Sequence, residues 1–265
     1  MRKTIIAGNW KMHLNVQQSS LLVHRLSENI KLQRNIEVIL APSLLALQPL
    51  SLQIDRRVFG LAAQNAYYKD EGAYTGEISF AMLRGLAKYV IIGHSERRIY
   101  FHENLETIRD KVAAAVRNEI APILCVGETK HERSSGETKR VLHDQIISAL
   151  SNLISQEIDN VVIAYEPIWA ISSFGGELAK PPEVARELAY IRRQIAELYG
   201  QTVAEKLRIL YGGSVDDQTA GSYLELPGCD GALVGAASLN WAKFSGIVST
   251  AEKLRHEIIK AKDPN

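Results

Sequence analysis

Eight short apolar segments recur along this chain of 265 residues, and they constrain its fold more than any other feature. Each is rich in valine, isoleucine, leucine or alanine, which is typical of strands buried on both faces. The segments between them carry apolar residues at helical spacing, for example Ile108, Val112 and Ala115. The predicted strands are Thr4–Ala7, Ile36–Leu40, Val58–Ala62, Tyr89–Ile92, Ile123–Val126, Val161–Ala164, Leu207–Leu210 and Ala232–Val234. Strands and helices therefore alternate along the whole chain.

This alternation predicts a parallel sheet of the α/β class. Eight strand-helix units can close into a (β/α)8 barrel, and an open doubly wound sheet would more often carry a Gly-x-Gly-x-x-Gly turn, which this sequence lacks. Pro181 and Pro182 precede an amphipathic segment and predict the first turn of a helix there. No Pro-rich or Ser-rich linker divides the chain. We expect residues 1–265 to form a single barrel domain.

The charge balance and the cysteines limit the partners and the compartment. Lys and Arg number 31 against 30 Asp and Glu, so we expect no binding to nucleic acid or to a membrane surface. Cys125 and Cys229 are far apart in sequence and predict free thiols in a reducing compartment. The first apolar segment ends at Asn9 and Lys11, too early for a signal peptide, and no segment approaches about 18 apolar residues. A cytoplasmic protein is expected.

Polar side chains and small residues follow most of the predicted strands. In a barrel of this kind the chemistry takes place at the carboxyl ends of the strands. Glycines after the last two strands let backbone N–H groups approach an anion closely. The residues at these ends are Asn9, Lys11, Gln64, Asn65, His94, Ser95, Glu96, Glu128, Glu166, Gly212, Gly213, Ser214, Gly235 and Ala236. They predict an active site at one rim of the barrel.

Taken singly, each of these residues has another interpretation. Glu166 also suits a surface ion pair, and His94 also suits a helix cap or a buried histidine. Lys11, considered alone, also suits a solvated surface position, and paired glycines usually mark an ordinary turn. Together, a carboxylate can remove a proton next to a carbonyl while an imidazole and an ammonium stabilise charge on oxygen. The set therefore favours enolisation, and the sequence contains no zinc spacing, Ser-His-Asp order or phosphate-binding P-loop.

Ordered blocks along nearly the whole chain resemble the triosephosphate isomerase family. They are Gly8–Met12, Gln64–Asn65, Gly72–Glu77, Gly93–Arg98, Cys125–Thr129, Ala164–Ile171, Tyr211–Val215 and Leu233–Gly235. The resemblance implies a (β/α)8 TIM barrel that interconverts dihydroxyacetone phosphate and D-glyceraldehyde 3-phosphate in glycolysis and gluconeogenesis. It implies no metal and no organic cofactor.

The resemblance also implies roles for the catalytic residues. Glu166 would be the base that carries a proton between C1 and C2, and His94 a neutral imidazole that polarises the carbonyl. Lys11 would supply positive charge, and Asn9 a hydrogen bond to the substrate oxygen. Glu96 would orient Lys11 or His94, or else form an ion pair with the neighbouring Arg97 or Arg98.

The remaining implied site residues bind phosphate, close a lid or join two subunits. Backbone N–H groups at Ser172, Ser214, Gly235 and Ala236 would hold the phosphate. Ile171 and Leu233 would press over Glu166 when the lid closes, with Trp169 and Tyr211 in the lid and its clamp. Gly72–Glu77 would enter a neighbouring subunit and bring Thr75 near that subunit's Lys11, so a homodimer is implied.

The sequence departs from the family at the lid, where Ser172–Lys180 replaces the usual Gly-Thr-Gly and short polar stretch and makes the tip about two residues longer, and at Ala236, where a second glycine is common. We expect Phe174 and Leu178 to pack this longer tip onto neighbouring loops, with Gly175-Gly176 as its hinge. An isomerase for a tetrulose phosphate, a barrel that binds a phosphorylated ligand without turnover, and a Schiff-base aldolase at Lys11 remain the alternatives.

Overall fold

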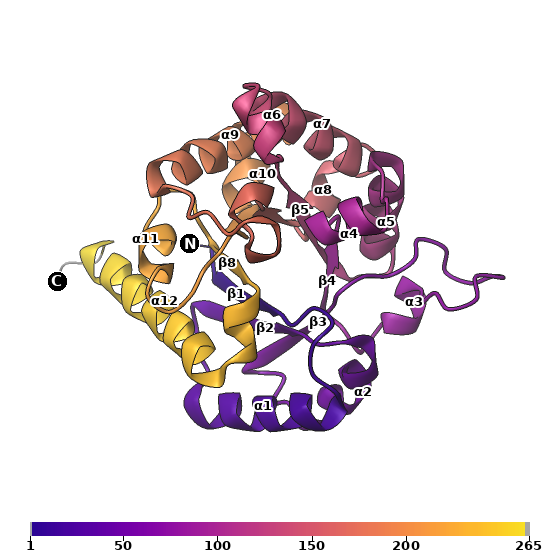
Figure 1. The fold of residues 1–265 in the computed structure, drawn as a ribbon, viewed down its shortest axis with the longest axis vertical. Coiled ribbons are helices and arrows are strands. Elements are labelled where there is room, and N and C mark those ends of the chain that lie inside the picture. The colour runs from indigo at the N-terminus through magenta and orange to yellow at the C-terminus, as the bar shows by residue number, and fades with distance from the viewer. Residues whose placement is uncertain (1, 263–265) are drawn as a thin grey trace.

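Eight parallel strands form a closed barrel in the computed structural model, which describes residues 2–262 (Figure 1). The strands follow one another around the barrel in sequence order, and β8 pairs with β1 to close it. They are β1 Thr4–Asn9, β2 Ile36–Ala41, β3 Phe59–Ala63, β4 Tyr89–Ile92, β5 Ala121–Val126, β6 Val162–Tyr165, β7 Arg208–Tyr211 and β8 Gly231–Val234. The predicted (β/α)8 barrel is confirmed.

Helices surround the barrel and connect consecutive strands (Figure 1). The α-helices are α1 Val16–Asn29, α2 Leu44–Gln53, α3 Phe80–Leu83, α4 Ser95–Tyr100, α5 Leu105–Arg117, α6 Lys130–Ser134, α7 Thr138–Leu150, α8 Ser155–Ile158, α9 Pro181–Tyr199, α10 Gln201–Lys206, α11 Ala220–Leu224 and α12 Trp241–Lys262. Three short 3₁₀ helices, η1 Ile168–Ala170, η2 Ser172–Phe174 and η3 Ala236–Leu239, lie in the last loops. None of the helices within residues 2–262 has the length and apolarity needed to cross a membrane.

The apolar core has two parts because successive strand residues point to opposite faces. One cluster consists of strand residues and fills the barrel, with Ile5, Ile39 and Ile91 among its members. The other lies between strands and helices and contains Ile6 from β1 and Leu188 from α9. Strands covered on both faces are apolar throughout, which explains the continuous apolar segments in the sequence.

The predicted element boundaries agree with the structure to within about two residues. Strand β1 extends to Asn9, two residues beyond the predicted end, and β5 begins at Ala121, two residues before the predicted start. Helix α9 begins at Pro181, so the prediction from the proline pair is confirmed. Each strand therefore delivers the polar residues that follow it to the same rim.

At the opposite rim, an ion-pair cluster joins residues of β2 and β7 and the residue that precedes β4. The Glu37 carboxylate on β2 lies 2.5 Å from the Lys88 ammonium and 3.2 Å from the Arg208 guanidinium on β7. Burial opposes ionisation of Glu37, but the hydrogen bond from Lys88 and the two positive charges outweigh it and lower the pKa of Glu37 below 4.5. The folded protein therefore favours the ionised form of this carboxyl group.

Glu37→Gln is expected to lower the free energy of unfolding at pH 7 and to have progressively less effect as the pH falls. A lowered pKa in the folded state contributes stability above the unfolded-state pKa, and this contribution is lost as the pH falls through the folded-state pKa. Urea unfolding of both proteins between pH 7 and pH 3 measures the difference. Glu28→Gln, at an exposed position, is the control, and a difference independent of pH would contradict the assignment.

Candidate active site

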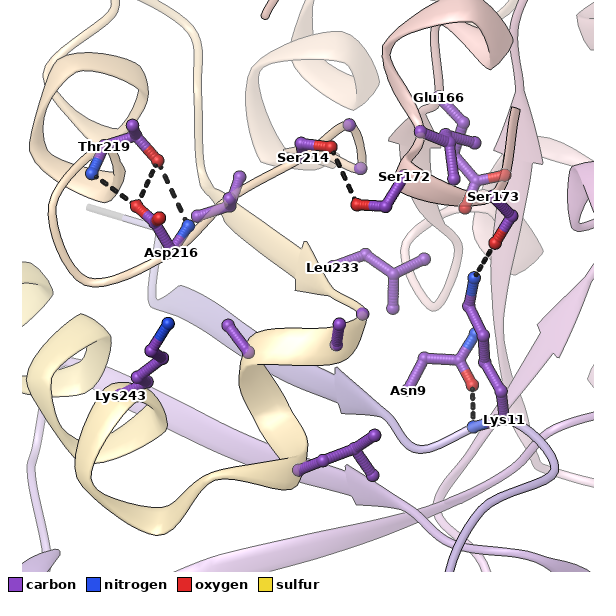
Figure 2. A pocket seen from close by; sticks show the side chains of 18 of the residues that line it. Asn9, Lys11, Glu166, Ser172, Ser173, Ser214, Asp216, Thr219, Leu233 and Lys243 are labelled. Carbon is purple, nitrogen blue, oxygen red and sulfur yellow. Dashed lines mark hydrogen bonds between the residues drawn. The ribbon is translucent and has the colours of Figure 1, made fainter. Parts of the chain in front are cut away.

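The carboxyl ends of the strands open into a cavity of about 470 Å³ (Figure 2). Most of the site residues predicted from the sequence line it. They are Asn9, Lys11, His94, Glu166, Ile171, Ser172, Ser214, Leu233, Gly235 and Ala236. Glu96, Trp169 and Tyr211 are not among the lining residues, and Thr75 lies in an exposed loop.

Glu166 follows β6 and its side chain is buried, with 2% of the residue exposed. Its Oε1 atom lies 3.3 Å from His94 Nε2, and its Oε2 atom accepts a hydrogen bond of 3.3 Å from the backbone N–H of Ser95. The Ser95 N–H belongs to the first turn of α4, where N–H groups stabilise negative charge. The carboxylate is thus held at the start of a helix and faces the imidazole.

His94 is the N-cap residue of α4, and the cap fixes which ring nitrogen carries a proton. The backbone N–H of Glu96 donates to His94 Nδ1 over 3.3 Å. A nitrogen that accepts this bond has a free lone pair, so the proton of a neutral ring is on Nε2. Nε2–H points into the cavity region occupied by Glu166 Oε1. His94 is therefore placed to donate a hydrogen bond from Nε2 into the cavity.

Lys11 has a left-handed backbone conformation, with φ of 52°, which is uncommon for a residue other than glycine. Two contacts hold this conformation. The Gln64 side chain donates to the Lys11 carbonyl over 2.8 Å, and the Lys11 N–H donates to Asn9 Oδ1 over 3.1 Å. Backbone strain is retained where the surrounding structure enforces it, often at functional sites. Here it directs the ammonium toward the cavity (Figure 2).

Glu96 forms its ion pair with Lys11, at 2.6 Å between Nζ and Oε1, and not with the arginines that follow it. Arg97 pairs with Glu103, and Arg98 donates to the carbonyl of Gly93 over 2.7 Å. Burial is the largest single influence and opposes ionisation of Glu96, but the hydrogen bonds from Lys11 and Ser173 and the nearby positive charge together outweigh it and lower the pKa of Glu96. Of the two alternatives in the sequence, the structure contains the pair with Lys11.

The predicted phosphate-binding residues all line the cavity. Ser172 Oγ lies 3.1 Å from Ser214 Oγ, and Gly235 and Ala236 stand at the start of η3. The Ser214 N–H, however, donates to the Ala170 carbonyl over 3.0 Å. To bind a phosphate, this N–H has to leave the Ala170 carbonyl and donate to a phosphate oxygen instead. The bond to Ala170 could not be predicted from the sequence.

The base of the lid is tied to a buried carboxylate. Trp169 Nε1 donates to Glu128 Oε1 over 2.9 Å, and burial raises the pKa of Glu128. Ile171 and Leu233 are 6% and 3% exposed and line the cavity beside Glu166. Tyr211 is buried and stacks on Tyr223, and within residues 2–262 its hydroxyl has no hydrogen-bond partner. In this conformation, therefore, Tyr211 makes no hydrogen bond to the lid.

The lid tip packs on one side only. The Phe174 ring lies 5.7 Å from the ring of Tyr100 on α4, as expected of a packing residue. Leu178 is 61% exposed, so the expectation that it packs the tip was wrong. It lies at the mouth of the cavity, where no neighbouring loop covers it. Gly175 and Gly176, with φ of 129° and 64°, adopt conformations that other residues rarely take and let the chain reverse after Phe174.

Three residues take part in the site without having been assigned a role from the sequence. Gln64 holds the Lys11 backbone, and Ser173 contacts the Lys11 ammonium. Cys125 is buried, and burial together with the neighbouring Glu166 carboxylate raises the pKa of its thiol.

Both cysteines are free, as predicted. Among residues 2–262 no group of three His, Cys, Asp or Glu side chains is placed to hold a metal ion, and independence from cofactors stays a prediction.

Gly212 leaves the space that the Glu166 side chain occupies. A Cβ atom at position 212 would lie 2.7 Å from Glu166 Cγ. Gly212→Ala is therefore expected to displace the carboxylate and to lower kcat/KM about 100-fold, since small misplacements of reacting groups have effects of that order. Gly221→Ala on α11, where the nearest atom would be 3.7 Å away, is the matched control. Equal kcat/KM for Gly212→Ala and the unsubstituted chain would contradict this prediction.

The fold and the cavity together define a barrel enzyme in which a buried carboxylate and an imidazole face each other at the carboxyl ends of the strands, an arrangement suited to a proton-transfer isomerase. A sequence model of the family described as triosephosphate isomerase matches residues 4–251. The chain belongs to the triosephosphate isomerase family.

Similar proteins cover nearly all of the chain. A triosephosphate isomerase of Chloroherpeton thalassium is 43% identical over 254 residues, which is 95% of this chain and all of that protein. One of Clostridium perfringens is 43% identical over 250 residues, covering 94% of this chain and all of that protein. One of Clostridium tetani is 44% identical over 250 residues, covering 94% of this chain and 97% of that protein. The likeness therefore extends over the whole barrel.

Proposed function

We propose that this chain interconverts dihydroxyacetone phosphate and D-glyceraldehyde 3-phosphate, the reaction of its family in glycolysis and gluconeogenesis. The observation that carries the proposal is the 3.3 Å separation of Glu166 Oε1 and His94 Nε2 at one end of a cavity of about 470 Å³. A carboxylate base opposite a neutral imidazole is the pairing described for triosephosphate isomerases as a class.

In the proposed reaction Glu166 removes a proton from C1 of the ketose. The electron pair of the C–H bond forms a C1–C2 double bond, and the carbonyl electrons move onto the oxygen at C2. His94 Nε2–H donates to the substrate oxygens, and the Lys11 ammonium stabilises the developing negative charge. Glu166 then returns the proton to C2, while the proton of the O1 hydroxyl is transferred to O2 through His94, and the product is the aldose. Asn9 contributes a further hydrogen bond from β1.

The phosphate is proposed to bind at backbone N–H groups of Ser172, Ser214, Gly235 and Ala236, which line the same cavity. The first residues of η3 support this assignment, because N–H groups at a helix start have no acceptor within the helix. Ile171 and Leu233 then exclude water from Glu166 when the lid closes, with Trp169 and Tyr211 beneath it.

We infer that the working form is a homodimer. The loop between β3 and α3 extends away from the barrel, and residues 69–77 are all exposed (Figure 1). Beside Lys11 lies a second cavity of about 350 Å³, lined in part by Met12 and Phe101, which are 96% and 63% exposed. A loop carrying Thr75 from a second copy would cover these apolar side chains.

Sedimentation velocity tests the dimer. The purified chain is expected to sediment as a dimer at micromolar concentration, and Met12→Glu is expected to shift it toward monomer by replacing an exposed apolar side chain of the proposed interface with a charge. A monomeric unsubstituted chain would overturn the inference.

We further infer that residues 1–265 act as one catalytic domain in the cytoplasm. The two free cysteines support the compartment, because free thiols are typical of reducing environments. Small phosphorylated trioses are the proposed substrates, without nucleic acid or membrane partners.

Steady-state turnover of glyceraldehyde 3-phosphate and dihydroxyacetone phosphate tests the function. We expect both directions to be catalysed, and a rate no better than buffer for both would end the proposal. A tetrulose phosphate is the second substrate to assay, because the same proton transfer works on any 2-hydroxy carbonyl compound and the lid Ser172–Lys180 departs from the family pattern. A higher kcat/KM for the tetrulose phosphate would reassign the substrate and leave the chemistry unchanged.

A further inference from the structure

Ser173, at the tip of the lid, contacts both partners of the ion pair between Lys11 and Glu96. Lys11 Nζ donates to Ser173 Oγ over 3.2 Å, and the Ser173 hydroxyl donates to Glu96 Oε1 over 3.1 Å. Lys11 Nζ also donates to the same Glu96 oxygen over 2.6 Å. The three groups form a closed ring of hydrogen bonds, and Figure 2 shows the contact between Ser173 and Lys11.

This ring fixes the direction of the remaining ammonium proton. A lysine ammonium has three N–H donors in a tetrahedral arrangement. With only the Glu96 bond, the group can rotate about that bond, and its other two donors have no fixed direction. When Glu96 and Ser173 each hold one donor, the third has a single direction. Lys11 lines the cavity, so this third donor is the one available to a substrate oxygen.

The contact depends on the position of the lid tip. Ser172, Ser173 and Phe174 form the 3₁₀ helix η2, in which successive side chains point about 120° apart. The Ser172 side chain therefore points to Ser214, and the Ser173 side chain points from a different side of the same turn to Lys11. Phe174 packs on Tyr100, which lies on the same helix, α4, as Glu96. The tip docks on α4 through one apolar contact and one polar contact.

We propose that Ser173 is a positioning residue that orients the Lys11 ammonium when the lid tip docks on α4. Ser173 touches no reacting atom and acts through Lys11, so that the charge-stabilising donor has a fixed direction while the lid tip rests on α4. The proposal rests on the proposed isomerase function, and it gives the lengthened lid of this chain a specific task. If the tip moved away from α4, Lys11 would keep its bond to Glu96 but would lose the second contact that fixes its orientation.

Ser173→Ala in the full-length chain tests this role. We expect kcat/KM and kcat to fall together by about fivefold, the size of one modest charge-assisted hydrogen bond, with KM changed less than twofold. Ser173→Thr keeps the hydroxyl and is expected to restore the rate. Ser134→Ala, on α6, removes a hydroxyl that bonds only the His131 carbonyl and is the matched control. Thermal unfolding of all variants is expected to be unchanged, because the Ser173 side chain is exposed.

A double substitution separates this role from simple latching of the lid. If Ser173 acts through the ammonium, Ser173→Ala has no further effect on kcat/KM in a Lys11→Met background. A fivefold loss in both backgrounds would overturn the proposal in favour of a latch, and no loss in the unsubstituted background would overturn it outright. Neither of these two results contradicts the proposed isomerase function. That function fails only if the unsubstituted chain does not turn over triose phosphates.

Discussion

Glu166→Gln is expected to lower kcat/KM for glyceraldehyde 3-phosphate by about 10⁴-fold, the upper end of the usual contribution of a general base. Glutamine has nearly the same shape as glutamate but cannot accept a proton from carbon. It can still accept the hydrogen bond that Ser95 N–H now donates to the carboxylate. The variant is therefore expected to fold normally, and the loss is expected in the chemical step.

Steady-state assays with enough enzyme to detect the residual rate measure this loss, and thermal unfolding checks the fold. Glu225→Gln, at an exposed position, is the matched control and is expected to leave kcat/KM unchanged. Glu166 would lose its assignment as the base if the glutamine variant kept more than a tenth of the activity.

Lys11→Met is expected to lower kcat/KM about 10²-fold to 10³-fold, because it removes the positive charge beside the oxygen where negative charge develops. It also leaves the carboxylate of Glu96 without its partner at 2.6 Å, adding a negative charge close to the enediolate. Lys11→Arg is expected to recover only part of the loss, since a planar guanidinium cannot reproduce the direction of the ammonium donors.

The measurement compares kcat/KM of the three proteins over a range of salt concentrations, with Lys3→Met as an exposed control. A fully active Lys11→Arg variant would mean that charge alone suffices at this position. A fully active Lys11→Met variant would remove Lys11 from the catalytic set.

The barrel could be predicted from the sequence because strands covered on both faces need continuous apolar residues. The segments around Ile6, Ile91 and Ile163 carry this signal, and all lie in strands of the closed sheet. The helical start at Pro181 followed from the fixed φ of proline. The rim of the site followed from topology, because parallel strands place every residue after a strand at the same end.

The contacts within the site could not be predicted because they join residues distant in sequence through particular side-chain conformations. The Gln64 side chain, directly after β3, donates to the Lys11 carbonyl. Glu96 forms its ion pair with Lys11 and not with the arginines that follow it in sequence. Leu178 is apolar and was expected to pack, but its surroundings leave it exposed. No local pattern encodes which of several chemically suitable partners lies within 3 Å.

The sequence by itself determined the order of strands and helices, the closed parallel sheet they require, and the rim at which Glu166, His94 and Lys11 would meet. These features depend on periodicity and on local propensity, which short stretches of chain already contain. Only the tertiary structure decided the protonated nitrogen of His94, the left-handed backbone of Lys11 and the engagement of Ser173 with the ion pair. Those properties depend on distances of about 3 Å between segments that closure of the barrel brings together, and hydrogen bonding falls off steeply beyond such distances.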